Sequence, residues 1–397
     1  LRPDAAAFGS RRAGGRGGRI AALAPSLAAS PSRRTLDVGD SYITPGFVDI
    51  HAHIFAGVTS WGIRPDPACL RSGVTTVVDA GSAGWTMLQG FRWYVHEPSK
   101  VRALCFLHIS GIGLVSGWVN ECEDMRHQDP LTVGENVAEN RDFVVGVKVR
   151  QGIGQVGKNG VEPLRRAVEA AEIAGTPLMC HIAEGIALRD VLDLLRPGDI
   201  VTHCFQGKGV HGENVTDPAG RLLPEVIDAR QKGVVMDVGH GGGSFRWEIA
   251  EAALAEGFLP DVISTDLHAY NLYGPLYDMA TTLTKFLYLG VPLEDVVTAA
   301  TAAPARSIGR PDLGTLALGA PADLAIFRIA EEPVELWDTH VQRRTWDRRL
   351  RVEATVREGV VYRPEELAVE SEEEITRRCR KRGPDGMRFS WKRLLAD

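Results

Sequence analysis

Eight short apolar runs, separated by segments of helical character, constrain the fold of this chain more than any other feature. Runs with little polar alternation are typical of strands that are buried on both faces of a parallel sheet. Eight strand–helix units predict an α/β protein with a closed (β/α)8 TIM barrel, and a doubly wound open sheet is the alternative. The runs are FVDI at 47–50, VTTVVDA at 74–80, VRALCFLHI at 101–109, FVVGVKV at 143–149, PLMCHI at 177–182, DIVTHCF at 199–205, VVMDVG at 234–239 and DVISTDL at 261–267.

Two of the intervening segments have clear helix boundaries. The segment 161–175 has Pro163 near its start and Gly175 at its end. The segment 274–290 runs in the same way from Pro275 to Gly290. Proline near the first turn and glycine after the last are the expected asymmetry of a helix, so both segments are predicted to be helices.

The two ends of the chain lack the strand–helix alternation of the predicted barrel, which spans residues 46–310. Residues 19–45 and 311–365 contain strand-like pieces with turn glycines, which predict a small β-sandwich domain formed from both chain ends. Residues 1–18 are rich in Arg, Gly and Ala and are predicted to be poorly ordered. Residues 366–397 alternate both charge signs, so they are expected to form a solvated helix or a loose extension.

Composition excludes several classes of protein. A net charge of −6 gives no electrostatic footprint for nucleic acid, and no apolar run reaches membrane-spanning length. The six cysteines include no CxxC pair, which argues against a thiolate zinc site and fits a reducing cytoplasm. A basic, apolar N-terminal stretch loosely resembles a secretory signal, but a short strand, GRIAAL, is favoured there because Pro25 interrupts the apolar core.

Imidazole and carboxylate side chains recur at the C-terminal ends of the predicted strands. His51 and His53 are two residues apart and therefore point to the same side of the first strand. His181, His203 and Asp266 occupy the ends of the fifth, sixth and eighth. One histidine at a strand end is usually structural, but a set at one end of a barrel predicts a metal site with nitrogen and oxygen ligands.

Lys148 lies among valines in the fourth run, FVVGVKV. Burial of an ammonium group is unfavourable unless the charge is paired or removed. A salt bridge to Asp79 or Asp237 is one solution. The other is covalent modification, because a neutral amine can add carbon dioxide and become a carbamate, an anionic oxygen ligand able to bridge two metal ions.

These motifs together resemble the amidohydrolase superfamily, in particular its dihydroorotase-like branch of predicted amidohydrolases and deacetylases. The resemblance spans roughly residues 19–365 and implies two divalent metal ions, with zinc expected, a carboxylated Lys148 as bridging ligand, and Asp266 as both ligand and catalytic acid–base. The implied metal ligands are His51, His53, Lys148, His181, His203 and Asp266. The motifs are PGFVDIHAH (45–53), DAGSAG (79–84), VGVKVR (145–150), RPGDIVTHCF (196–205), VGHGGG (238–243) and STDLH (264–268).

The same resemblance implies a small-molecule substrate, with an ester or amide bond cleaved in acetylated 2-hydroxy or amino acids. A cyclic amide hydrolase of the dihydroorotase or hydantoinase kind is the alternative. Dihydroorotases place an arginine two residues after the second histidine, where this chain has Phe55. A non-catalytic scaffold is less favoured because the ligand set is complete, and a secreted binding protein depends only on the signal-like N-terminus. The sequence is compatible with a homo-oligomer.

Three residues are candidates for substrate binding. Arg150 shares strand parity with Lys148 and could clamp a carboxylate, with a salt bridge at the rim as the alternative. His240 and His268 could contact the reacting groups, with surface exposure as the alternative. The string GIGQVG (152–157) matches a dinucleotide-binding pattern, but the following run ends in a histidine instead of an acidic residue, so a nucleotide site is not expected.

Overall fold

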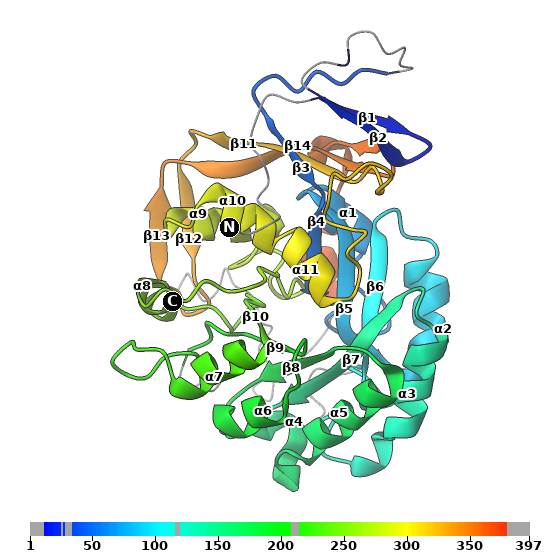
Figure 1. Cartoon of the computed structure of the whole chain (residues 1–397), viewed down its shortest axis with the longest axis vertical. Coiled ribbons are helices and arrows are strands. Elements are labelled where there is room, and N and C mark those ends of the chain that lie inside the picture. The colour runs from blue at the N-terminus through cyan, green and yellow to red at the C-terminus, as the bar shows by residue number, and fades with distance from the viewer. Residues whose placement is uncertain (1–11, 25–26, 28–33, 116–119, 208–213, 379–397) are drawn as a thin grey trace.

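A curved sheet of seven parallel strands forms the centre of the computed structural model, which describes residues 12–24, 27, 34–115, 120–207 and 214–378 (Figure 1). The strands follow chain order across the sheet, so each neighbour in sequence is a neighbour in space. All seven coincide with predicted apolar runs. They are β4 (Phe47–Ala52), β5 (Val74–Gly84), β6 (Arg102–His108), β7 (Val144–Gln151), β8 (Leu178–Ile182), β9 (Ile200–Thr202) and β10 (Val235–Asp237).

The eighth predicted strand, over residues 261–267, closes the ring without forming a regular ladder. Single parallel bridges join Asp237 to Val262 on one side and Ala52 to Leu267 on the other. Asp266 leaves the extended conformation with a φ of 51°, which interrupts the strand where it meets β4. The predicted TIM-barrel fold is therefore confirmed, with an irregular eighth position.

Helices cover the outer face of this sheet (Figure 1). The predicted helix over 161–175 is confirmed as α5, which ends at Gly175 in the left-handed conformation. The second predicted helix begins later than expected, because Asp278 caps α9 by accepting from the Thr281 N–H and Pro275 lies in the preceding loop. The helices are α1 (Pro65–Leu70), α2 (Leu88–Phe91), α3 (Pro130–Glu139), α4 (Ile153–Val156), α5 (Glu162–Ala174), α6 (Leu188–Leu194), α7 (Pro224–Lys232), α8 (Trp247–Ala255), α9 (Met279–Tyr288), α10 (Leu293–Ala299) and α11 (Ala302–Ser307).

A separate four-stranded antiparallel sheet brings the two ends of the chain together above the barrel (Figure 1). Strand β3 pairs with β11, although nearly the whole barrel lies between them in sequence. Ile326, Ala354 and Val356 form its own small apolar core. The strands are β3 (Tyr42–Pro45), β11 (Leu324–Ala330), β14 (Arg349–Arg357) and β15 (Val360–Tyr362).

Two hairpins accompany this sheet. Strands β1 (Arg12–Arg16) and β2 (Arg19–Ala24) pair through a turn at Gly17 and Gly18, whose φ values of 59° and 74° suit glycine. The prediction of a poorly ordered segment is therefore wrong for residues 12–18, and residues 1–11 lie outside the described part. Strands β12 (Val334–Trp337) and β13 (Arg343–Trp346) extend along the barrel towards α8 (Figure 1).

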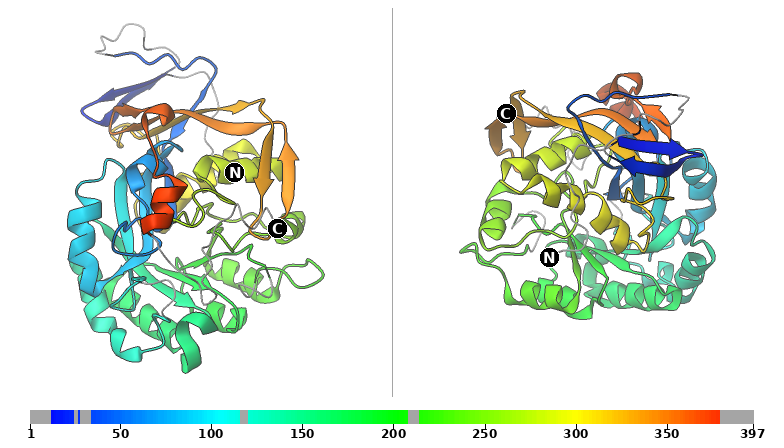
Figure 2. Two further views of the ribbon diagram at one scale, coloured as in Figure 1. Left: turned by 180° about the vertical axis from the view of Figure 1, so that it is seen from behind. Right: turned by 45° about the horizontal axis from the view of Figure 1, so that its top comes forward.

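The charged C-terminal segment begins with contacts to the barrel. Tyr273 Oη donates to the Glu370 carbonyl at 2.6 Å, and helix α12 (Glu372–Arg378) buries Ile375 against the main core (Figure 2). The helix that was predicted there is thus present but not fully solvated. The remainder of the predicted extension, 379–397, lies outside the described residues.

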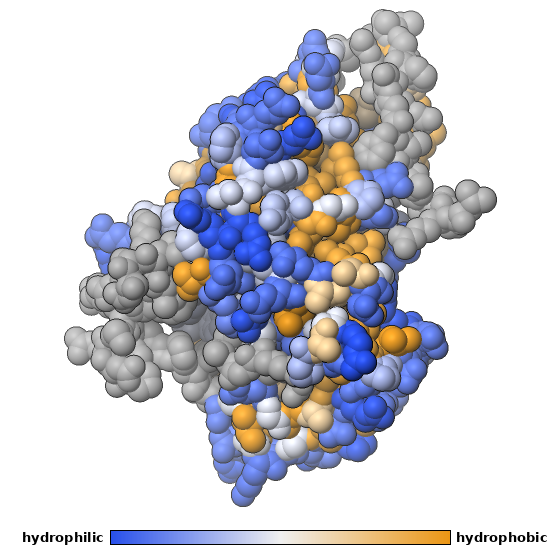
Figure 3. Space-filling model, turned by 90° about the vertical axis from the view of Figure 1, so that its left-hand side faces the viewer, coloured by the Kyte–Doolittle hydropathy of each residue, from blue (hydrophilic) through white to orange (hydrophobic). Residues whose placement is uncertain are grey.

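Within the described ranges, no helix has the length and hydropathy needed to span a membrane. One face of the molecule is mainly hydrophilic, with apolar residues gathered in a band between polar ones (Figure 3). Five of the six cysteines lie in the described part, and all five are buried and form no disulfide there.

The junction between barrel and β-sheet domain yields a stability prediction. Asp323 accepts from Arg102 of β6 at 2.6 Å and from the Glu358 N–H at 2.8 Å, in a largely buried position. Asp323→Ala leaves both donors without this partner and should lower the free energy of unfolding by about 2–4 kcal/mol in urea titrations. Glu332→Ala removes an exposed partner of Arg351 and should change it by less than about 1 kcal/mol. Equal effects of the two substitutions would contradict this account of the junction.

Candidate metal centre

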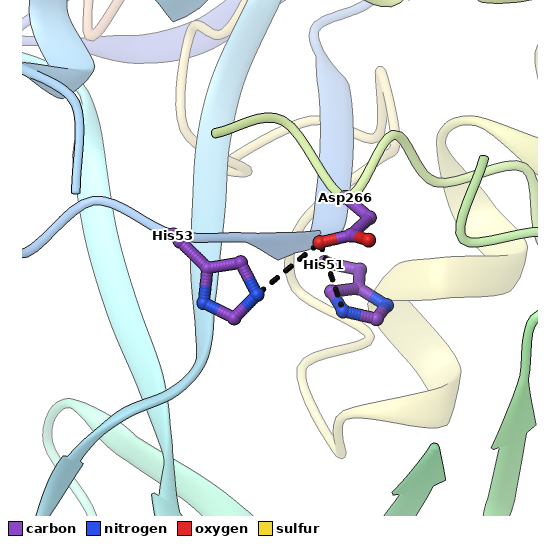
Figure 4. Close-up of side chains that lie close together, drawn as sticks. All are labelled: His51, His53 and Asp266. Atoms are coloured by element: carbon purple, nitrogen blue, oxygen red, sulfur yellow. Dashed lines mark ion pairs between the residues drawn. The ribbon is translucent and has the colours of Figure 1, made fainter. Parts of the chain in front are cut away.

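Three predicted ligands converge where β4 meets the irregular eighth position. His51 Nε2 lies 3.4 Å and His53 Nε2 lies 3.2 Å from Asp266 Oδ1 (Figure 4). Their potential ligand atoms all lie within 4.8 Å of one another, and all three residues are buried. A single cation could therefore contact all three side chains.

The other two predicted histidines form an adjoining pair. His181 Nδ1 and His203 Nε2 face each other at 2.7 Å. The His203 ring centroid is 5.1 Å from that of His51, which makes the two groups one continuous cluster. His203 Nδ1 donates to the Gly239 carbonyl at 2.6 Å, so the nitrogen that faces His181 is left to act as an acceptor or ligand.

Buried polar partners orient the rings of the first pair. His51 Nδ1 lies 3.0 Å from Thr202 Oγ1, which itself donates to Asp237 at 2.7 Å, so Nδ1 is the nitrogen that donates. His53 Nδ1 contacts Ser82 Oγ at 3.0 Å. These contacts direct both Nε2 atoms towards Asp266, the arrangement expected for metal-binding histidines with fixed tautomers.

Burial sets the charge state of this cluster. Burial lowers the pKa of His53 to about 3 and that of His51 well below its usual value, while it raises the pKa of Asp266. Protonated imidazoles are thus disfavoured, and the contacts to Asp266 are not full ion pairs. Neutral imidazole is the form that binds a metal ion.

Lys148 lies on β7 in the same buried region. Its side chain is 1% exposed, and Nζ has no hydrogen-bond partner among the described residues. The alternative of a salt bridge is wrong, because no carboxylate in the described part lies within ion-pair distance of Nζ: Asp79 accepts from Ser82 N–H and Ile54 N–H, and Asp237 from Thr202 and Ser264. Burial lowers the Lys148 pKa from 10.5 to about 8, so the neutral amine is more accessible here than in an exposed lysine.

Two of the predicted ligands are held in a backbone conformation that L-residues seldom adopt. His203 has a φ of 79° and Asp266 a φ of 51°. Such strain persists where surrounding structure imposes it, and it is common at functional sites. Here it turns both side chains off the strand direction and into the cluster.

The donor set fits divalent metal ions. It offers neutral imidazole nitrogens and a carboxylate, and Asp266 Oδ1 and Lys148 Nζ are buried without a hydrogen-bond partner in the described part. Nitrogen and oxygen ligands of this kind suit zinc and related cations. All six predicted ligands lie in this one region.

Comparison with known proteins places the chain in a family. A model of the "Amidohydrolase family" matches residues 245–356. The chain is 40% identical to a deacetylase of Agrobacterium fabrum over 81% of this chain and 79% of that protein. It is also 40% identical to a deacetylase of Brucella anthropi, over 82% and 81%. The chain belongs to the amidohydrolase superfamily.

Solved structures agree with this assignment. An adenine deaminase structure superimposes with a TM-score of 0.84 at 33% identity, covering 89% of this chain and 96% of that one. A dihydroorotase structure gives a TM-score of 0.82 at 36% identity, covering 91% and 95%. The resemblance seen in the motifs is therefore confirmed, and the relatives support a hydrolase.

Arg150 of this amidohydrolase, predicted to bind a substrate carboxylate, already forms an ion pair within the protein. Its Nε and Nη2 donate to the two oxygens of Glu121 at 2.7 and 2.8 Å, and both side chains are buried. The salt bridge that the sequence left as the alternative is therefore present, with Glu121 as the partner, although both side chains are buried. Burial alone would raise the pKa of Glu121, but Arg150 lowers it to about 2, so the carboxylate stays charged.

The two further histidine candidates differ from each other. His268 is buried beside Trp61, with ring centroids 4.6 Å apart, and its Nδ1 accepts from the Tyr270 N–H. Its Nε2 is thus a potential donor next to Asp266. His240 is also buried, so surface exposure is wrong for both, but its two ring nitrogens face the Gly241 carbonyl and Lys285 Nζ. This geometry is against direct substrate contact by His240.

Sequence reasoning missed His108, which ends β6 and pairs with Lys148 across the sheet. His108 lies near the C-terminal end of the run VRALCFLHI, the same position in a strand that drew attention to the other histidines. His108, Glu121 and Cys122 also lie close enough together to suggest a second cation site. However, both Glu121 oxygens already accept from Arg150, and a fixed guanidinium disfavours a cation there.

The tight approach of Gly239 to the cluster yields a prediction about metal affinity. A Cβ at Gly239 would lie 2.1 Å from Thr202 Oγ1 and 2.9 Å from His203 Nδ1, at a φ of +46°. Gly239→Ala should therefore displace His203 and weaken zinc binding by about tenfold or more in competition with a chromophoric chelator. Gly154→Ala, where a Cβ meets no atom within 4 Å, is the matched control. Wild-type affinity in Gly239→Ala would exclude this role of the glycine.

Proposed function

We propose that this amidohydrolase is a metal-dependent deacetylase of small acetylated 2-hydroxy or amino acids. The observation that carries the proposal is the cluster of His51, His53, His181, His203 and Asp266 beside Lys148, whose amine has no hydrogen-bond partner among the described residues. The names of similar proteins support the reaction, since three relatives at 34–40% identity are called deacetylases.

In this proposal Lys148 is carboxylated and supplies a second anionic group beside the Asp266 carboxylate. The neutral amine nitrogen attacks carbon dioxide, an N–C bond forms, and one proton leaves. The pKa of about 8 makes the neutral amine accessible near neutral pH. His51, His53, His181, His203 and Asp266 complete the ligand set for two divalent ions, with zinc expected from the donor chemistry.

The chemistry divides between metal ions and residues of the chain. Bound divalent ions would lower the pKa of water and polarise the acyl carbonyl. Asp266 accepts a proton from the attacking water and delivers it to the leaving oxygen or nitrogen, as general base and then acid. Burial raises the pKa of Asp266, the direction that favours proton uptake by this carboxylate.

Two side chains would read the substrate in this proposal. Arg150 offers Nη1, the guanidinium nitrogen that Glu121 does not engage, to a substrate carboxylate. Its ion pair with Glu121 holds the guanidinium plane fixed, which favours one orientation of the acid. His268 offers Nε2–H beside Asp266.

A cyclic amide hydrolase is the second candidate, favoured by the 36% identity to the dihydroorotase structure. The same metal centre could serve that reaction. Phe55 counts against it, because its ring packs edge-on against Phe91 in the apolar core, 5.3 Å between centroids, where dihydroorotases carry an arginine. The deacetylase proposal places its carboxylate-binding group on Arg150 instead.

The direct test is acetate release from a panel of N-acetyl and O-acetyl acids. Protein loaded with zinc should bind close to two ions per chain, release acetate, lose activity on chelation and regain it with zinc. Dihydroorotate and hydantoin in the same assay report the cyclic alternative. Ring opening without acetate release would reject deacetylation, and a fully loaded protein that turns over no member of either panel would favour a scaffold.

Asp266→Asn tests proton transfer separately from ligand binding. Asparagine still offers an oxygen but cannot carry the proton, so kcat should fall by at least about 100-fold. The zinc content should remain near that of the wild type. A kcat within about threefold of the wild type would remove Asp266 from the proton-transfer role.

A further inference from the structure

Lys285 is a second fully buried lysine, on α9 and outside the metal centre. Its Nζ lies 2.7 Å from His240 Nε2, 3.0 Å from the Pro275 carbonyl and 2.6 Å from the Trp337 carbonyl. An ammonium group has three protons and can donate to all three acceptors. Burial lowers the pKa of Lys285 to about 7, but loss of a proton would leave one acceptor unmet, so the contacts favour the charged form.

These three acceptors come from separate parts of the fold. His240 belongs to the glycine-rich segment after β10, Pro275 to the loop that follows the eighth barrel position, and Trp337 to the β12–β13 hairpin. Thr339, in the turn of this hairpin, makes a second contact with the barrel, because its hydroxyl donates to the Phe245 carbonyl at 2.7 Å. Lys285 thus joins two loops at the C-terminal end of the barrel to the C-terminal β-structure.

His240 transmits this restraint to the glycine-rich segment. Its ring stacks on Phe245, with centroids 4.6 Å apart and planes within 10°. Burial lowers the pKa of His240 well below its usual value, so the ring is neutral. With Nε2 accepting from Lys285, Nδ1 carries the proton and donates to the Gly241 carbonyl at 3.0 Å. Both nitrogens therefore hold the loop in one position.

The glycines on either side of His240 contact the proposed metal ligands. The Gly239 carbonyl accepts from His203 Nδ1 at 2.6 Å. A Cβ on Gly241 would lie 2.5 Å from Asp266 Oδ2, which shows how closely the backbone passes that carboxylate. A shift of this segment would move the hydrogen bond that orients His203 and open the space beside Asp266.

We propose that Lys285 is a positioning residue of the metal centre. It holds His240, and through His240 it fixes the segment 239–241 against His203 and Asp266. The Trp337 carbonyl makes the C-terminal hairpin part of this support. The proposal rests on the proposed function in one respect, that His203 and Asp266 are metal ligands. Lys285 itself touches neither the metal nor the substrate.

The test compares Lys285→Met with its neighbour Thr284→Val in the full-length, metal-loaded protein. Thr284 is equally buried on α9, and its Oγ1 accepts from the Leu350 N–H of β14 at 3.1 Å. Thr284→Val therefore also removes a hydrogen bond between α9 and the C-terminal strands. Lys285→Met should weaken cobalt binding about tenfold or more, alter the cobalt absorption spectrum and lower kcat by a similar factor, with KM within about threefold. Thr284→Val should lower the unfolding temperature but leave the spectrum and affinity unchanged.

A purely structural Lys285 would give a different result. Lys285→Met would then be less stable than the wild type, like Thr284→Val, but would keep the wild-type cobalt spectrum and affinity, and this outcome overturns the proposal. If Lys285→Met does not fold, His240→Phe replaces it, because phenylalanine keeps the stack on Phe245 and removes only the hydrogen bonds. A wild-type spectrum and affinity in His240→Phe overturns the proposal equally.

The cobalt measurements need no turnover, so the two proposals fail separately. A protein that releases no acetate, yet binds cobalt more weakly after Lys285→Met, would reject deacetylation and retain the positioning role. If the Lys285→Met protein releases acetate at the wild-type rate, the positioning role is rejected and the deacetylase proposal is retained.

Discussion

The central constraint on the barrel interior is that the Lys148 amine is buried with no hydrogen-bond partner among the described residues. A lone ammonium at this depth would be strongly unfavourable, and no carboxylate in the described part lies within ion-pair distance of it. The rings of His51, His53 and His203 make hydrogen bonds through Nδ1, and their Nε2 atoms face the cluster. Metal ions and a carbamate together would satisfy every one of these inward-facing groups.

Residues far apart in the chain maintain this arrangement. Asp237 accepts from Thr202, which holds His51, and also from Ser264, which in turn accepts from the Gly239 N–H. Around the rim, Glu121 neutralises Arg150, and Trp61 packs against both His53 and His268. The proposed ligands are thus positioned by the ends of nearly all the barrel strands.

The barrel and the cluster of residues proposed as metal ligands could be predicted because both follow local rules. Buried parallel strands read as apolar runs, and functional groups follow their C-terminal ends, which was enough to find His51, His53, His181, His203 and Asp266. The partners of these residues could not be predicted in the same way. The contact of His51 with Thr202 spans 151 positions, and that of Asp49 with Thr265 spans 216, so no local pattern reveals them.

Several errors also have physical causes. Arg150 has the strand parity expected of a clamp, but parity cannot show that Glu121 from a loop reaches it first. Pro275 looked like a helix start, whereas the side-chain cap that begins α9 is Asp278. The hairpin at residues 12–24 depends on the turn at Gly17 and Gly18. A segment rich in Arg, Gly and Ala is predicted to be poorly ordered when only its composition is considered. The three acceptors of Lys285 lie outside α9, in two loops and a separate hairpin, so only the fold reveals them.

The most direct test of the central claim is carbon-13 NMR of the zinc-loaded protein prepared in carbon-13 bicarbonate. The account predicts a carbamate resonance in the wild type that is absent in Lys148→Met and is lost when zinc is removed by a chelator. A wild-type protein that holds its full complement of zinc and hydrolyses substrate, but shows no carbamate resonance, would contradict the role given to Lys148.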